Sequence, residues 1–165
     1  MSDDHLLAIY LNDHLAAATG GVELFRRVSR SGTDVKTVAE LTALTDEVVS
    51  DRDALRLLMR RLSIEERRPM EALGWFGEKL GRLKPNGRLL SRSPLSDVIE
   101  MEGLRLSVQS KLGCWRVLRT LADHDPRVAT REMDALIGRA EEQARRIDVL
   151  HHQAAEQRLA VSGVR

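Results

Sequence analysis

The chain is poor in the residue types that mark several other fold classes. Its 165 residues include one cysteine, four prolines, two tryptophans, two phenylalanines and one tyrosine. The single cysteine, Cys114, excludes a disulfide framework and a cysteine-based zinc cluster. Since strands are enriched in aromatic residues, their scarcity here argues against an all-β sandwich.

The chain also lacks an excess of either charge and any long apolar run. Lys and Arg total 26 against 25 for Asp and Glu, so the net charge is +1 and gives no overall attraction to nucleic acid or anionic membranes. No run approaches the ~18–20 apolar residues that cross a bilayer. The acidic start Ser2-Asp3-Asp4 is unlike a secretory signal peptide. We therefore expect a cytoplasmic protein without membrane or nucleic-acid partners.

Apolar residues recur at helical spacing over most of the chain, which predicts four long helices. Their expected limits are about Ser2 to Ser29, Thr33 or Asp34 to Leu62, Ser93 to Ala122 and Asp125 to Val161. Short connections join the first pair and the last pair, so each pair should form an antiparallel hairpin. We expect one domain over residues 1–165, with hairpins at 3–62 and 94–161 and a crossover at 63–93.

The crossover has signals of its own. The spacing of Ser63 and Glu66 is that of a capping box and predicts one helical turn. A short fifth helix is expected from Pro69 to Leu83. This helix could dock onto the bundle or could bind a polyanion through its basic residues, and we favour docking. The basic residues expected to bind a polyanion in the second case are Arg68, Lys79, Arg82, Lys84 and Arg88.

Two hairpins joined by a long crossover resemble the ferritin-like superfamily in the order of their elements. The stretches 10–15 (YLNDHL) and 74–83 (GWFGEKLGRL) are similar to those of bacterial helical-bundle proteins of unknown activity. The resemblance implies an all-α, up-and-down four-helix bundle. In its di-iron members the four helices carry Glu, Glu-x-x-His, Glu and Glu-x-x-His in order.

This chain matches the second half of that pattern better than the first. Glu102 lies in the apolar sector expected for helix 94–122, and Asp148 with His151 gives Asp-x-x-His on the last helix. The first half offers His14 and Asp51, each on the apolar stripe of its helix, and residues 33–62 contain no histidine. The resemblance thus implies these five residues as tentative ligands for iron, manganese or zinc. Ordinary pairing among them, without any cofactor, is the favoured interpretation.

The helix register predicts which of these residues meet. Residues equally far from the turn of an antiparallel hairpin lie at the same height, because the rise per residue is constant. His14 and Asp51 are level by this rule, and so are Glu102 and Asp148. Because buried charges need partners, we expect a contact between His14 and Asp51 and one from Glu102 to Asp148 or His151.

No nucleotide-binding, nucleophile-elbow, zincin or EF-hand motif occurs in the chain. The favoured function is a non-catalytic protein that acts through oligomerisation or partner binding. The alternatives are a metal-binding or redox protein and a polyanion-binding module. We expect a homodimer that buries part of helix 94–122, the crossover helix or both, because helix 94–122 has a wide apolar sector that includes Leu95 and Ile99. The apolar residues outside its main stripe are Leu104, Val117, Leu118 and Leu121.

Overall fold

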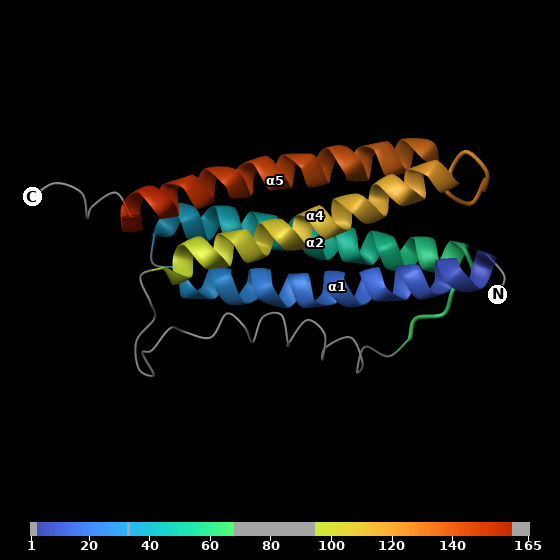
Figure 1. Ribbon diagram of the computed structural model, residues 1–165, viewed down its shortest axis with the longest axis horizontal. Helices are drawn as coiled ribbons and strands as arrows, with labels where there is room; N and C mark the ends of the chain where they lie inside the picture. Colours follow the sequence, from blue (N-terminus) through green and yellow to red (C-terminus); the bar gives the residue numbers. More distant parts are fainter. Residues whose placement is uncertain (1–2, 33, 68–94, 160–165) are drawn as a thin grey trace, which may run out of the picture.

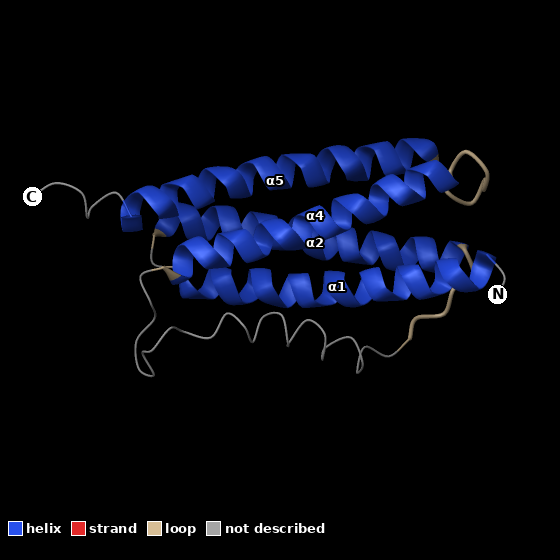
Figure 2. Cartoon of the chain, viewed as in Figure 1, coloured by secondary structure: helices blue, strands red, loops and turns tan. Residues whose placement is uncertain are grey.

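The computed structural model describes residues 3–32, 34–67 and 95–159, and this part contains helices and loops but no strand (Figure 2). The prediction of an all-α fold is confirmed. None of the described helices is both long enough and apolar enough to span a membrane. The four helices are α1 (Asp3–Ser31), α2 (Val35–Arg61), α4 (Ser96–Leu121) and α5 (Thr130–Leu159).

The crossover predictions fall mainly outside the described residues. This applies to the expected helix from Pro69 to Leu83 and to the start signal at Ser93. It also applies to the tentative polyanion-binding residues, which are Arg68, Lys79, Arg82, Lys84 and Arg88.

The four helices pack side by side along their lengths (Figure 1). Helix α4 lies between α1 and α5, while α2 contacts both α1 and α5. Surface ion pairs join α4 to α5, and their partners shift toward the start of α4 as α5 proceeds. In order along α5 the pairs are Asp134–Arg119, Glu141–Arg116, Asp148–Arg105 and Arg158–Asp97.

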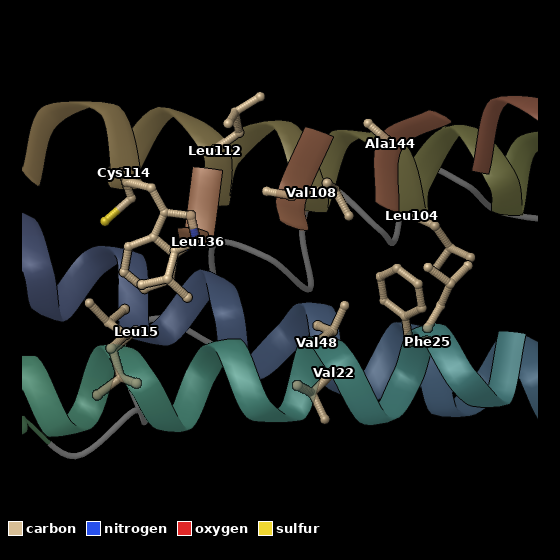
Figure 3. Close-up of a cluster of buried hydrophobic side chains, with 14 of the residues drawn as sticks. Leu15, Val22, Phe25, Val48, Leu104, Val108, Leu112, Cys114, Leu136 and Ala144 are labelled. Atoms are coloured by element: carbon tan, nitrogen blue, oxygen red, sulfur yellow. The ribbon is translucent and has the colours of Figure 1, made fainter. Parts of the chain in front are cut away.

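All four helices contribute to one apolar core, part of which Figure 3 shows. Helical periodicity places its members on one face of each helix, and full burial of such a side chain contributes roughly 1.5–3 kcal/mol. The largest fully buried side chains include Phe25 of α1 and Trp115 of α4. Leu104 and Leu118 are also fully buried. Their assignment to an apolar surface outside the main stripe is therefore wrong.

Helices α1 and α4 approach closely where their side chains are small. A Cβ atom at Gly21 would overlap the hydroxyl of Ser107, and one at Gly103 would lie 3.4 Å from a methyl group of Leu24. The absence of a side chain at Gly21 lets the two helix backbones come together. Ser107 also lines the cavity described below.

The end of α2 differs from the prediction at Ser63. Ser63 has a φ of 58°, and its backbone N–H donates to Arg60 O over 3.0 Å. The next N–H, of Ile64, donates to Met59 O over 2.9 Å. These bonds form a Schellman motif that ends a helix. The predicted capping box is wrong, since Ser63 closes α2 and residues 64–67 are not helical.

The start of α5 also differs. The Asp125 carboxylate accepts a hydrogen bond from the backbone N–H of Arg127 over 2.9 Å and so closes a turn. Helix α5 begins only at Thr130. In contrast, the start of α2 agrees with the sequence, because the Asp34 carboxylate accepts from Thr37 N over 2.8 Å. This cap holds the pKa of Asp34 below its usual range.

Candidate functional site

A buried ionic cluster occupies the middle of the bundle, centred on Asp51 of α2. Its carboxylate is fully buried and accepts hydrogen bonds from three side chains. Lys111 Nζ of α4 is one donor. The others are Arg139 Nε of α5, at 2.7 Å, and Gln143 Nε2 of α5, at 3.1 Å. One carboxylate therefore ties α2 to both α4 and α5.

Gln143 extends the cluster toward the surface. Its Oε1 accepts from Lys111 Nζ over 2.6 Å, and its Nε2 also donates to Glu47 over 3.0 Å. Arg146 in turn donates to Glu47 over 2.5 Å. Asp51, Lys111 and Gln143 therefore each have a partner in this cluster, which a buried network requires if it is to stabilise a fold.

Burial outweighs pairing in its effect on the pKa of the Lys111 ammonium group. Desolvation lowers the pKa of its ammonium group, and the nearby Asp51 carboxylate raises that pKa by less. Buried ion pairs gain little over apolar residues, but removing one partner leaves an uncompensated charge. The cluster therefore selects the packing in which α2, α4 and α5 bring these groups together.

A small cavity of about 20 Å³ lies beside the cluster, between α1, α2 and α4. Asp51 and Lys111 form part of its wall, together with His14, Cys114 and Trp115. A volume of this size holds about one water molecule. The indole N–H of Trp115 is buried and has no hydrogen-bond partner among the described residues. With a volume of about 20 Å³, the cavity is too small for an organic substrate.

Burial also controls the chemistry of His14 and Cys114. Desolvation lowers the pKa of His14, against a smaller opposing effect of Asp13. Desolvation raises the pKa of the Cys114 thiol to about 12. A thiol in that state is protonated at neutral pH and is a poor nucleophile. These two residues therefore line the cavity as neutral groups.

The predicted contact between His14 and Asp51 does not form. The His14 ring instead packs edge-on against Tyr10, with ring centroids 4.5 Å apart. The predicted core-facing position of Asp51 is correct, but its partners are Lys111, Arg139 and Gln143. Equal height of His14 and Asp51 does not by itself produce a contact, because Lys111 and Arg139 reach the Asp51 carboxylate instead.

The second predicted contact is present, at the surface. Glu102 Oε1 lies 3.4 Å from His151 Nε2, without the geometry of a hydrogen bond. Glu102 is 57% exposed, so its predicted place in the apolar sector of the helix is wrong. Asp148 is bound by Arg105, one turn further along α4, and this guanidinium holds the pKa of the carboxyl below its usual range.

The five residues predicted as metal ligands do not form one site. Lys111, the α4 partner of Asp51, follows Glu102 by nine positions, which corresponds to about 13 Å along the helix. Across residues 3–32, 34–67 and 95–159, no three His, Cys, Asp or Glu side chains lie close enough to hold a metal ion. His14 and Asp51 line the central cavity, whereas Glu102 and His151 meet at the surface.

A row of exposed apolar side chains follows the outer face of α4 and includes its N-cap residue Leu95; we call it the α4 row. Its members are Leu95 (43% exposed), Ile99 (37%), Leu106 (71%) and Val117 (46%). Separations of 4, 7 and 11 residues place them on one helical face. Gly113 shares this face, and a Cβ atom there would meet nothing within 4 Å. Of these residues Val117 was predicted outside the main stripe, whereas Leu95 and Ile99 were predicted within the apolar sector of the helix; their exposure corrects that prediction. No prediction was made for Leu106.

Comparison with protein-family models, with curated proteins and with solved structures finds no significant match to this chain.

Proposed function

We propose that this chain is a non-catalytic, ferritin-like helical-bundle protein, built of two antiparallel hairpins, that acts through protein contacts as a homodimer. The observation that carries the proposal is the α4 row. Large apolar side chains gain about 25 cal/mol for each Å² removed from water, and α4 exposes them in a single line. An exposed apolar surface of this kind is typical of a protein–protein contact.

The interior supports a non-catalytic role. The Asp51 carboxylate is occupied by three donors, and the neighbouring Cys114 thiol is protonated at neutral pH. The adjoining cavity holds about one water molecule. These groups are arranged to hold helices together, which leaves the outer surface as the place where the protein meets other molecules.

The likeness to ferritin-like proteins is part of the same proposal. Its support is the order of the described elements: α1 and α2 follow each other closely, α4 and α5 do the same, and the long segment 62–95 separates the two pairs. Helices α2 and α5 meet through the buried cluster around Asp51. The proposal does not require the di-iron chemistry of that superfamily.

Multi-angle light scattering at micromolar concentrations tests the proposal. As the concentration rises, the wild-type mass should increase from the 18.5 kDa of one chain toward twice that value. Leu106→Glu should shift the protein to monomer, because a carboxylate would be buried in the contact. Val149→Glu is the matched control, since Val149 is an exposed valine on α5, away from the α4 row. Wild-type protein that stays monomeric throughout would overturn the proposal.

A further inference from the structure

The α4 row is symmetric about Leu106. Leu95 and Val117 each lie 11 residues from Leu106, and Ile99 and Gly113 each lie seven residues from it. In a two-fold contact between antiparallel helices, residues equally far from the axis face each other. A second copy of α4, placed antiparallel across the row, would therefore bring Leu95 opposite the partner's Val117 and Ile99 opposite the partner's Gly113.

We infer that two copies of this chain join through antiparallel α4 helices, with the two-fold axis at Leu106. This inference rests on the homodimer proposed above and specifies its geometry. Leu106 packs against the partner's Leu106. Ile99 packs against the partner's Gly113, and Leu95 faces the partner's Val117. Each apolar member of the row then has an apolar or small counterpart.

The pairing of Ile99 with the partner's Gly113 matches a large residue to a small one. Gly113 is exposed and has open space where a side chain would stand, so a side chain of a second copy can approach its backbone there. The branched side chain of Ile99, 37% exposed, is of a size to fill that space. This is the interdigitation of large and small residues by which packed helices exclude voids.

A parallel arrangement fits the same residues less well. It would place Glu102, which lies at the edge of the row and is 57% exposed, against its own copy, so two carboxylates would repel. It would also set Gly113 against Gly113 and leave the open space there unfilled. The antiparallel arrangement instead places Glu102 opposite the hydroxyl of the partner's Ser110, and it opposes the two helix dipoles favourably.

The length of the row indicates the strength of the contact. Leu95 and Val117 are 22 residues apart, which is about 33 Å along the helix. A single pair of helices in contact over this length buries a small area compared with the roughly 1,200–2,000 Å² buried in a standard stable complex. We therefore expect a dimer that dissociates in the micromolar range, where light scattering can follow it.

Disulfide trapping tests the geometry in the full-length chain. Leu106→Cys, Ile99→Cys and Gly113→Cys each add one exposed thiol, while Cys114 stays buried. Under mild oxidation Leu106→Cys should form a covalent dimer alone, because disulfides need Cβ atoms about 3.5–4.5 Å apart. Ile99→Cys mixed with Gly113→Cys should also cross-link. Either variant alone should not, because its two thiols would lie about 21 Å apart across the axis.

The outcomes separate this inference from the proposed function. Cross-linking of Ile99→Cys alone, without a gain on mixing with Gly113→Cys, would mean a parallel contact and would overturn the inference. A dimer by light scattering in which none of these variants cross-links would also overturn it, while leaving the proposed homodimer intact. Protein that is monomeric by light scattering would overturn both. Val149→Cys is the control for random collision and should remain uncross-linked.

Discussion

Replacement of Asp51 by asparagine should strongly destabilise the fold. Asparagine has nearly the same shape as aspartate but no charge, so the buried ammonium group of Lys111 would lose its counter-charge. Breaking a buried ion pair by removing one partner typically costs about 3–5 kcal/mol. Arg139 is more exposed and can turn toward water, so the penalty falls mainly on Lys111.

Urea denaturation followed by circular dichroism measures this loss as a fall in the free energy of unfolding. Asp134→Asn is the matched control, because Asp134 pairs with Arg119 at the surface and is 59% exposed. Exposed pairs of this kind contribute about 0–1 kcal/mol. Asp51→Asn combined with Lys111→Met should recover part of the loss, since the unpaired charge is then removed.

The pH dependence of Lys111 gives the prediction a second readout. Its pKa in the folded state lies below the ordinary value of 10.5, so the unfolded chain binds this proton more tightly. The contribution of Lys111 to the free energy of unfolding therefore rises with pH between the lowered pKa and 10.5. Asp51→Asn removes the carboxylate that raises this pKa, so the rise should begin at a lower pH.

One result would refute this reasoning directly. If Asp51→Asn costs no more than Asp134→Asn, the buried cluster does not hold a charged Lys111 against Asp51. The same conclusion would follow if Lys111→Met alone were as harmful as Asp51→Asn but the double variant recovered nothing. In that case the two residues would act independently.

Three further predictions concern other parts of the bundle. Ser63→Gly should raise the free energy of unfolding by about 0.5–1 kcal/mol in urea denaturation, because glycine adopts the positive φ of this position without strain; an unchanged or lower value would contradict the strain. Gly21→Leu should lower it by about 1–3 kcal/mol through overpacking against α4, whereas Gly21→Ala should be nearly neutral because the Ser107 hydroxyl can rotate away. Arg105→Ala should raise the pKa of Asp148 toward its ordinary value in a carboxyl NMR titration; an unmoved pKa would show that Arg105 does not set it. In the wild type this carboxylate stabilises the fold above the ordinary pKa, and the effect is lost as the pH falls through the lowered one.

The helices could be predicted because their signal is local. Apolar residues at helical spacing define α1, α2, α4 and α5, and the Asp34 cap set the start of α2 correctly. Two helix boundaries were predicted wrongly, at residues whose side chains are compatible with more than one local structure. Asp125 can cap a helix or a turn, and Ser63 can start a helix or end one. Which use prevails depends on how neighbouring backbone groups are satisfied, and short sequence patterns do not contain that information.

The candidate site was predicted only in part. The burial of Asp51 followed from its place on an apolar stripe, and the contact of Glu102 with His151 followed from register within one hairpin. The partners of Asp51 did not follow. Lys111 and Gln143 belong to the other hairpin, and the offset between hairpins is not contained in the spacing of residues along either one.

The sequence by itself determined the all-α class and which residues of each helix are apolar, because helical periodicity acts over a few turns of one segment. Only the tertiary structure decided which polar groups meet. It moved Glu102 to the surface, brought Lys111 to Asp51 and left Leu106 exposed on the outer face of α4. The physical reason is that the rotation and height of one helix against another are set by close packing of side chains from both, such as Gly21 against Ser107.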